Sequence, residues 1–452
     1  MMKTKREIFM YSLLEFKEIE KRLEQRASEG WRLKKTGFFW TYEQAEPKQV
    51  HYSIVFFPKT DNLEPEPSDS LLMMREYCER TGWKLVAEQG QMQIFCNEEA
   101  NPVPIETEAW IQVKNIHETM KKGIVLSHTI LFINAIVQLG LQAMQFFTDP
   151  LDWLSMGFNF FMVWCWIGLG IGSAVELIHY HSWYKKAKRI AEEEELLYLP
   201  KPITIFRTVC LTIAFIALAF AILALMDFTT GKYGALVVVW TVVILGIPVG
   251  GSRLLKKWKV SAKWNRVIII LLAIVCAVGM TAGMFMSVDH DADTIFNRND
   301  EMLLHVSDFR EVDEDELHGY PRKYDSIFMY REEGYQAESW VEGEDVNTRL
   351  HLNYSFIVIK VPFVYDFCKE ELIKDKMRYV EEGLDDQRGY RKVKMDIWEA
   401  EEVYQYHNFN GEPENEYLVC YPDRILQIDF GWNVVDVDIE KVKDAIISQV
   451  HF

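Results

Sequence analysis

The sequence has few cysteines, and their spacing excludes the commonest metal and redox motifs. Its 452 residues contain 7 cysteines, and no two of them form a CxxC pair. Because structural zinc sites and dithiol redox centres usually rely on such pairs, we expect no bound metal and no cofactor.

Signatures of the common enzyme classes are missing as well. The chain contains no GxSxG motif, no Walker loop, no HExxH motif and no set of kinase motifs. We therefore predict a protein without catalytic residues. An enzyme whose site is assembled from scattered residues is the alternative.

Basic residues are outnumbered, and the excess of acidic residues lies at one end of the chain. There are 49 Lys and Arg against 67 Asp and Glu, which gives a net charge of −18. Residues 289–452 alone carry 39 acidic and 18 basic side chains. This segment would repel phosphates, which argues against a nucleic-acid partner. The simplest interpretation of its charge is solubility.

What the sequence does have is five apolar segments, each long enough to cross a bilayer, which takes about 20 residues. They cover approximately residues 124–147, 155–180, 203–226, 233–251 and 267–287. This pattern predicts a five-helix transmembrane bundle within residues 123–288. It places the chain in the cell membrane as a multi-pass protein.

The loops between these segments predict the orientation. Eleven basic residues lie in the second and fourth loops: Lys185, Lys186, Lys188, Arg189, Lys201, Arg253, Lys256, Lys257, Lys259, Lys263 and Arg266. The first loop has none, and the third has only Lys232. Basic loops stay in the cytoplasm, and residues 1–25 contain no apolar core of signal-peptide length. We therefore expect a cytoplasmic N-terminus and, after five crossings, an extracytoplasmic C-terminus.

Polar side chains inside the apolar segments form a candidate site. Four amides follow one helical face of the first segment: Asn134, Gln138, Gln142 and Gln145. Because amides that face lipid are costly, this face predicts contacts between helices; a path for a ligand or solute is the alternative. Glu176, in the second segment, needs a partner unless it lies at the cytoplasmic interface beside the basic run from Lys185.

Pairs of glycines four residues apart predict close packing of helices. They are Gly168 and Gly172 in the second segment, and Gly279 and Gly283 in the fifth. Small residues at this spacing let two helices approach closely. We treat all four as candidate helix-packing positions.

Residues 1–100 contain an approximate internal repeat. A helical pattern over 15–29 ends at Gly30 and another over 69–81 ends at Gly82, and a tryptophan follows each glycine, 52 residues apart. Strand patterns lie at 8–13, 38–42, 50–57 and 92–96. The repeat predicts two strand–helix–strand–strand units that pair into one small α+β sheet with both helices on one face.

Four segments of this repeat carry a resemblance to a known family: residues 29–33 (EGWRL), 37–42 (GFFWTY), 50–52 (VHY) and 81–83 (TGW). On these residues the chain is similar to bacterial membrane proteins with an N-terminal domain of unknown function 2812. The resemblance implies a cytoplasmic domain joined to membrane helices, and it supplies no catalytic residues. Genes of that family often lie beside repressors of the PadR type, which makes a PadR-type regulator one candidate protein partner. A transporter subunit is the other candidate.

The remaining segments complete the predicted architecture. Residues 101–122 have the pattern of a linker and an amphipathic juxtamembrane helix, and residues 289–324 that of an acidic tether. Strand and helix patterns predict a second α+β domain over 325–452, outside the cytoplasm. The predicted fold is a multi-domain membrane protein with a soluble domain at each end.

Two cysteines, Cys368 and Cys420, belong to this last domain. The first falls on a predicted helix and the second on a predicted strand, and both can point into one core. Outside the cytoplasm they could form a disulfide if their α-carbons lie within about 7 Å. Two buried free thiols that pack as small hydrophobes are the alternative.

Together these features favour a non-enzymatic membrane sensor or regulatory protein, because two domains joined by a helical bundle can pass a signal to protein partners. The amides and Glu176 favour a transporter or a transporter accessory subunit instead, although five helices without an inverted repeat argue against a complete secondary transporter. A membrane assembly scaffold is the third interpretation.

Overall fold

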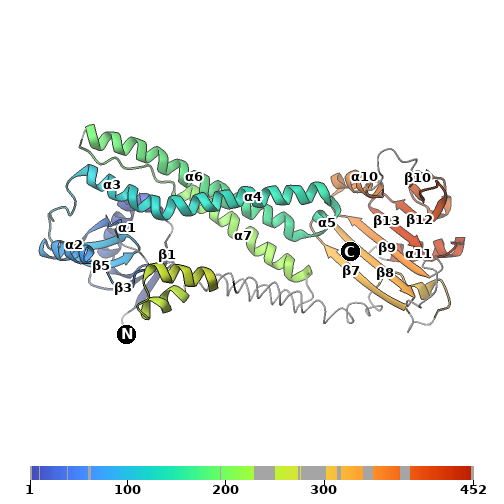
Figure 1. Ribbon diagram of the computed structural model, residues 1–452, viewed down its shortest axis with the longest axis horizontal. Helices are drawn as coiled ribbons and strands as arrows, with labels where there is room; N and C mark the ends of the chain where they lie inside the picture. The colour runs from blue at the N-terminus through green and yellow to red at the C-terminus, as the bar shows by residue number, and fades with distance from the viewer. Residues whose placement is uncertain are drawn as a thin grey trace. The chain divides into compact units, whose positions relative to one another are not determined.

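The computed structural model describes residues 3–9, 11–37, 39–59, 63–193, 195–228, 250–272, 275, 302–312, 317–338, 350–376 and 387–448 (Figure 1). The chain forms two compact units, and each is described by itself. The first comprises Met1–Gly140, Val163–Leu218 and Val239–Val278. The second comprises Leu141–Met162, Ala219–Val238 and Gly279–Phe452.

Two copies of one strand–helix–strand–strand unit form the N-terminal domain, residues 3–97. The first copy consists of β1 (Thr4–Ile8), α1 (Phe16–Ser28), β2 (Trp31–Lys35) and β3 (Phe39–Gln44). The second consists of β4 (His51–Phe56), α2 (Asp69–Arg80), β5 (Lys84–Gln89) and β6 (Met92–Asn97). After the two helices, Gly30 and Gly82 have φ of +83° and +85°, a conformation that would strain any side chain. The structure thus shows the predicted repeat, with its first strand at Thr4–Ile8 instead of 8–13.

Each copy closes its own antiparallel sheet, which corrects the prediction of one shared sheet. The strand order is β1-β3-β2 in the first copy and β4-β6-β5 in the second. The copies meet where the Thr36 hydroxyl donates to the Glu88 carbonyl at 2.7 Å, and where Trp40 Nε1 donates to Gln89 Oε1 at 3.3 Å. Apolar periodicity shows which face of a strand is buried, but it does not show which strands pair.

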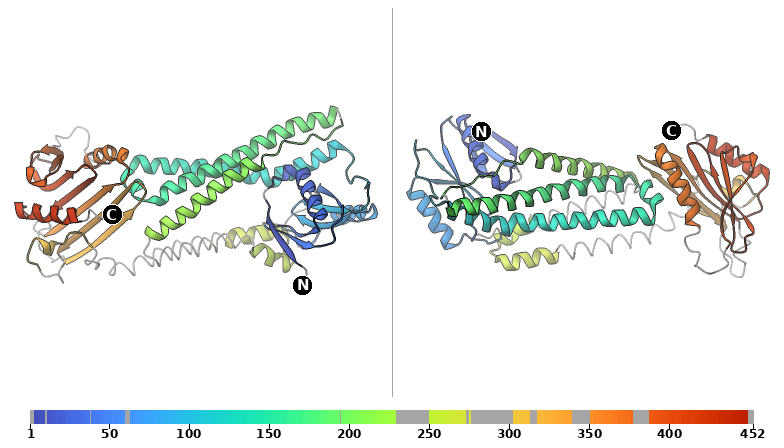
Figure 2. Two further views of the ribbon diagram at one scale, coloured as in Figure 1. Left: turned by 180° about the vertical axis from the view of Figure 1, so that it is seen from behind. Right: turned by 90° about the horizontal axis from the view of Figure 1, so that it is seen from above.

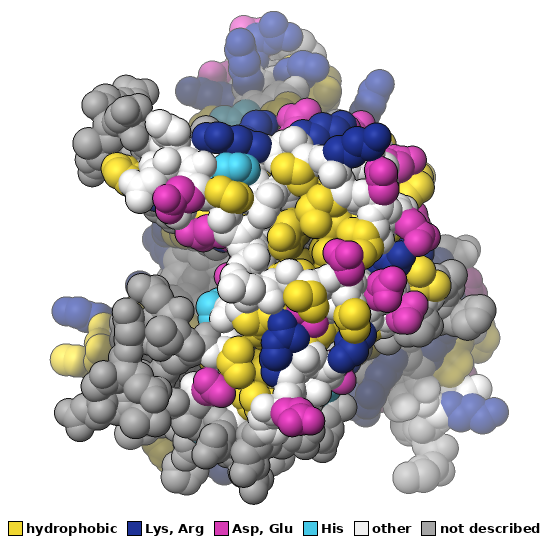
Figure 3. All heavy atoms as spheres, turned by 90° about the vertical axis from the view of Figure 1, so that its right-hand side faces the viewer, with side chains coloured by type: hydrophobic (Ala, Val, Ile, Leu, Met, Phe, Trp, Pro, Cys, Tyr) yellow, Lys and Arg dark blue, Asp and Glu magenta, His cyan; other side chains and the backbone are white. Residues whose placement is uncertain are grey.

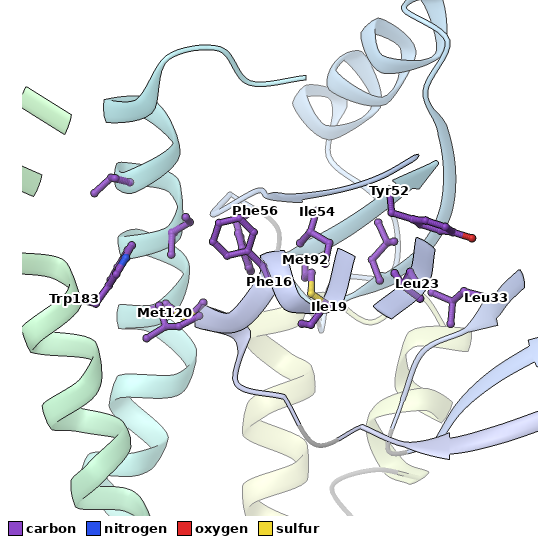
Figure 4. Packing of buried hydrophobic residues seen from close by; sticks show 14 of the residues in the cluster. Phe16, Ile19, Leu23, Leu33, Tyr52, Ile54, Phe56, Met92, Met120 and Trp183 are labelled. Atoms are coloured by element: carbon purple, nitrogen blue, oxygen red, sulfur yellow. The ribbon is translucent and has the colours of Figure 1, made fainter. Parts of the chain in front are cut away.

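The core of the N-terminal domain lies between α1 and the strands that face it. Figure 4 shows five of its side chains close together: Phe16, Ile19 and Leu23 of α1, with Ile54 and Phe56 of β4. These residues of α1 recur every three or four positions, which is typical of a helix that packs by one face. The same cluster includes Met120 of α3 (Ala109–Met120) and Trp183 of α6 (Gly157–Glu193), so the core continues into these helices.

Three helical segments are long and apolar enough to cross a membrane. The first is α3 continued through a π-helical turn at Lys121–Val125 into α4 (Leu126–Thr148); the others are α6 and α7 (Thr204–Phe228). They match the first three predicted segments and indicate an association with the membrane. The fourth and fifth predicted segments, 233–251 and 267–287, lie largely outside the described residues. In this part of the chain the structure describes helix at 250–257 and 262–272. The predicted five-helix bundle is therefore not supported by the described residues.

A seven-stranded antiparallel sheet is the centre of the C-terminal domain. Its strands are β7 (Leu317–Asp325), β8 (Met329–Glu338), β9 (His351–Ile359), β10 (Gly389–Val393), β11 (Glu402–His407), β12 (Pro413–Cys420) and β13 (Arg424–Phe430). Their order across the sheet is β10-β11-β12-β13-β9-β8-β7. The central strand β13 joins β12 and β9, which are far apart in the sequence.

Two helices cover opposite faces of this sheet, α10 (Tyr365–Asp375) and α11 (Asp436–Ser448) (Figure 2). Side chains of β9 alternate between the two faces. Tyr354 and Phe356 pack in the core that contains residues of α11, whereas Ile357 and Ile359 pack in the core that contains residues of α10. The sheet therefore separates two hydrophobic cores.

Part of the predicted acidic tether, 289–324, belongs to the folded C-terminal domain. Met302, Leu304 and Val306 are buried in the core on the α11 side, and β7 begins at Leu317. The low apolar content of this segment predicts a tether. A few apolar side chains that enter the core are nevertheless enough to pack the segment against the domain. On the face of the domain drawn in Figure 3, acidic and basic side chains are interspersed around hydrophobic ones.

Candidate functional site

The segment before α1 buries two polar side chains, Ser12 and Glu15. Residues Leu13–Glu15 form one turn of 3-10 helix, and Glu15 Oε2 accepts a hydrogen bond from the backbone N–H of Ser12 at 3.0 Å. The backbone N–H of Glu15 in turn donates to the Ser12 carbonyl at 2.9 Å. The carboxylate thus bonds back to the residue that precedes the turn, as in one half of a capping box, and the two bonds fix how the chain enters α1. Ser12 is 2% exposed and Glu15 is 3% exposed.

The Glu15 carboxylate also caps the first turn of α7. Its Oε1 accepts from the backbone N–H of Ile203 at 2.6 Å and of Thr204 at 3.0 Å, and its Oε2 accepts from the Thr204 hydroxyl. Backbone N–H groups at the start of a helix have no partner within the helix, and the helix dipole favours an anion there. Because the side chain of Ile203 has no acceptor, the N-terminal domain supplies the cap that α7 does not provide for itself.

A buried ion pair lies beside this cap. Arg207 Nη1, on α7, donates to Glu176 Oε1 of α6 at 3.1 Å, and the Ser12 hydroxyl donates to Glu176 Oε2 at 3.2 Å. The Glu176 side chain is 3% exposed and that of Arg207 is 18% exposed. Charges buried this deeply need partners. Ser12, Glu15, Glu176, Thr204 and Arg207, which we name the junction cluster, therefore connect α6, α7 and the N-terminal domain in one set of hydrogen bonds.

The partners of Glu176 show what the sequence could and could not reveal. The sequence predicts that Glu176 needs a partner, but it does not identify Arg207, Ser12 or Glu15. Arg207 is the lone basic residue near the start of the third apolar segment, and that isolation is a signal for an internal ion pair. Ser12 falls in the segment that the sequence predicts as a strand, which hides its role.

Close packing of α6 on α7 depends on glycine. A Cβ on Gly168 would lie 3.0 Å from the Cys210 carbonyl oxygen and 3.2 Å from the backbone nitrogen of Ala214. A Cβ on Gly172 would lie 3.4 Å from the Cys210 Cβ, which is an ordinary contact. Gly168 thus lies where a larger residue would collide with α7. The other two candidate positions, Gly279 and Gly283, lie outside the described residues.

The four amides of α4 are not gathered into one contact. Gln142 Oε1 accepts from Trp153 Nε1 at 2.7 Å. Gln142 and Gln138 are half-buried, whereas Asn134 and Gln145 are exposed. Helical spacing places these residues on one face, but it does not show how much of that face a neighbour covers.

A second contact, within the other unit, joins the loop between α4 and α6 to the C-terminal domain. This loop forms the short helix α5 (Pro150–Ser155), and its Leu151 and Leu154 are buried in the core that contains α10 residues. Arg331 of β8 donates from Nη1 to Asp152 at 2.6 Å and from Nε to the Ser355 hydroxyl at 3.2 Å. We name the pair Asp152 and Arg331, with the two leucines, the loop contact.

Cys368 and Cys420, the candidate disulfide pair, are free thiols in the structure. They are 0% and 1% exposed and belong to one core cluster. Burial raises the pKa of each thiol to about 12, because a thiolate would lose its hydration. The alternative of two thiols that pack as small hydrophobes describes this core.

The junction cluster is suited to holding helices in place. Each of its two carboxylates accepts hydrogen bonds from more than one donor, and these donors come from different elements. Among the described residues, no group of three or more His, Cys, Asp or Glu side chains is placed to hold a metal ion. The hydrogen bonds of the junction cluster join α6, α7 and the segment before α1.

Comparison with known proteins identifies one family. Residues 15–128 match the model of a family described as protein of unknown function (DUF2812). The match begins at Glu15 and extends through both repeats and α3 to the start of α4, so the chain carries this domain at its N-terminus. Neither a curated protein nor a solved structure matches the chain.

Proposed function

We propose that this chain, with its N-terminal DUF2812 domain joined to apolar helices, is a non-enzymatic membrane sensor or regulatory protein. It couples the C-terminal domain to the N-terminal domain and acts through protein partners. The observation that carries the proposal is the Glu15 cap, in which the N-terminal domain holds the backbone of α7 at Ile203 and Thr204. A shift of α7 against that domain must break or remake these hydrogen bonds.

The loop contact supports the proposed coupling at the C-terminal domain. α5 is the connection between α4 and α6, so a displacement of α5 acts on the ends of both helices. Helix α6 then runs without interruption from Gly157 to Glu193 and carries Glu176. A continuous helix therefore links the loop contact, through the chain, to the junction cluster.

For the orientation, we propose that the N-terminal domain lies in the cytoplasm and the C-terminal domain outside it. The support is the distribution of basic residues, with eleven in the second and fourth predicted loops and one in the other two. Basic loops are retained in the cytoplasm. An odd number of crossings, whether three or five, then separates the two domains.

An exposed apolar surface on α2 supports a protein partner for the N-terminal domain. Leu72, Met73 and Tyr77 are 48%, 64% and 61% exposed, and the four-residue spacing of Met73 and Tyr77 places these two side by side on the helix surface. Grouped apolar side chains on a soluble surface often mark an interaction site. A PadR-type repressor is the first candidate partner, on the basis of the family resemblance, and a transporter subunit is the second.

The experiment asks whether a change at the loop contact reaches the junction cluster. Asp152→Asn weakens the ion pair with Arg331, and the Asp152 side chain is 60% exposed, so the domain should still fold. In membranes, we expect faster hydrogen exchange at the backbone amides of Ile203 and Thr204. The matched control is Glu370→Gln, which removes an exposed charge from the pair with Lys374 on α10 and should leave those amides unchanged.

Exchange that changes only within the C-terminal domain would refute the coupling. Crosslinking in native membranes, with Leu72, Met73 and Tyr77 replaced one at a time by a photoreactive residue, tests the partner. Recovery of a repressor or another regulatory protein supports the proposal. Crosslinks to a transporter subunit would favour an accessory role, and crosslinks within this chain alone would favour a scaffold.

A further inference from the structure

A cavity of about 830 Å³ lies in the first unit, beside the start of α4. Its wall includes three cations, Lys59, Lys122 and Arg266, and none of its described lining residues is an Asp or Glu. A concave site whose described lining carries three positive charges and no carboxylate is electrostatically suited to an anion.

The fold holds these cations on the wall. Lys122 Nζ donates to the Pro58 carbonyl at 3.3 Å. Because Pro58 directly precedes Lys59, this hydrogen bond brings the two lysines close together. Arg266 follows Asn265, whose Nδ2 lies 3.5 Å from the carbonyl oxygen of Leu63. The preceding turn is held to the same loop by an ion pair between Lys259 and Glu66 at 2.8 Å.

A buried hydroxyl marks the same cavity. Thr119 is 5% exposed and lines the wall, and its Oγ1 has no hydrogen-bond partner within the described structure. Buried hydroxyls normally have a partner, so this one has unused hydrogen-bonding capacity beside the cavity. The π-helical turn Lys121–Val125 follows directly, and such turns are frequent at functional sites.

Apolar side chains line the part of the wall that adjoins the membrane-length helix, and Gln89 and Gln91 add polar groups elsewhere on the wall. Leu13, Met92, Ile124 and Leu126 line it, and Leu126 is the first residue of α4. The cavity is thus basic where it meets the loops of the N-terminal domain and apolar where α4 begins. A ligand that matches both parts has an anionic group attached to a hydrocarbon chain.

We propose that this cavity binds the phosphate group of an anionic phospholipid. Lys59, Lys122 and Arg266 neutralise the phosphate, and the Thr119 hydroxyl donates to one of its oxygens. The apolar side chains contact the part of the lipid that continues toward the acyl chains. A free phosphate ion shares the first part of this chemistry, but it is far smaller than the cavity and has no use for the apolar wall.

The experiment is native mass spectrometry of the full-length protein in detergent, with phosphatidylglycerol or phosphatidylcholine added. We expect bound phosphatidylglycerol, with a roughly tenfold or greater loss of affinity in the triple variant Lys59→Ala, Lys122→Ala, Arg266→Ala. The control is Lys185→Ala, Arg253→Ala, Lys257→Ala, which removes the same charge from exposed positions outside the cavity. It should bind phosphatidylglycerol as the natural sequence does.

Thr119→Val keeps the shape of the side chain and removes the hydroxyl, so it tests the site even if the triple variant does not fold. We expect it to weaken phosphatidylglycerol binding several-fold. Displacement of the lipid by excess inorganic phosphate would assign the phosphate site to the free ion. Equal binding of both lipids, equal losses in the two triple variants, or unchanged binding in Thr119→Val would overturn the proposal.

Discussion

At the scale of single residues, two buried carboxylates, Glu15 and Glu176, join the N-terminal domain to the helices through different partners. Glu15 binds backbone N–H groups of α7, whereas Glu176 binds a guanidinium on α7 and a hydroxyl of the N-terminal domain. Removing one member of a buried ion pair leaves an uncompensated charge, whereas removing a cap leaves unpaired donors. The two carboxylates should therefore respond differently to substitution.

Glu15→Ala removes the cap of α7 and one half of the capping box at Ser12. Loss of a helix cap typically costs about 1–2 kcal/mol, so we expect a lower midpoint of thermal unfolding for the full-length protein in detergent. Glu18→Ala is the control, because Glu18 pairs only at the surface with Lys21, at 2.8 Å and with its side chain 43% exposed. An equal shift in both variants would contradict the role given to Glu15.

The buried thiols lead to a prediction about reactivity. Burial raises the pKa of Cys368 and of Cys420 from 9.0 to about 12, and the thiolate is the form that alkylates. At pH 8 the folded domain should leave both cysteines unmodified by iodoacetamide, whereas both should react after denaturation. Mass spectrometry of non-reduced protein checks this. A peptide pair linked through Cys368 and Cys420 would show a disulfide instead.

At the scale of elements, local patterns were enough to predict what local patterns determine. The apolar periodicity and terminal glycines identify α1 and α2, and the long apolar runs identify α4, α6 and α7. These signals are local, because the residues that carry them belong to one continuous segment. Strand pairing is different, since it depends on which distant segment lies alongside. The predicted single N-terminal sheet is wrong for this reason. The docking of 302–312 is not predicted because it depends on a few buried apolar residues, Met302, Leu304, Val306 and Phe309, in a segment of low apolar content.

The packing of α6 against α7 gives a prediction that compares two glycines one helical turn apart. A Cβ at position 168 meets the Cys210 carbonyl at 3.0 Å, whereas one at position 172 makes an ordinary contact at 3.4 Å. Gly168→Ala should therefore destabilise the protein, by about 1–3 kcal/mol if the helices must separate. Gly172→Ala should be neutral or slightly stabilising, because alanine favours the helix. Thermal unfolding of both variants in detergent measures the two stabilities. Equal unfolding midpoints for Gly168→Ala and Gly172→Ala would contradict the prediction.

At the scale of the whole molecule, the sequence predicts a soluble domain at each end of a set of apolar helices, and the described residues agree with that order. The junction cluster could not be derived in the same way. Ser12, Glu176 and Arg207 come from three separate parts of the chain, and no spacing connects them. Glu176 and Arg207 each carry a signal, as ionisable residues in apolar segments, but nothing in the sequence pairs them, and Ser12 carries no signal.

The charge distribution of the loops predicts where each part of the chain lies. A reporter that is active only outside the cytoplasm should work when fused after Thr148, at the end of α4, or after Phe452. The same reporter fused after Glu193, at the end of α6, should be inactive. These outcomes follow from retention of the basic loops in the cytoplasm. Activity after Glu193 and none after Thr148 would reverse the orientation.

The length of α6 has a mechanical consequence. Its 37 residues extend about 55 Å at 1.5 Å per residue, whereas the hydrocarbon core of a bilayer is about 30 Å thick. With α6 crossing the bilayer as proposed, roughly 25 Å of helix is left over, and Trp183, Ala187 and Ala191 on this overhang are buried in the core of the N-terminal domain. A tilt of α6 in the membrane therefore displaces the end of this overhang. A tilt of about 10° would carry its far end through roughly 4 Å, and a close-packed core cannot absorb a displacement of that size without repacking.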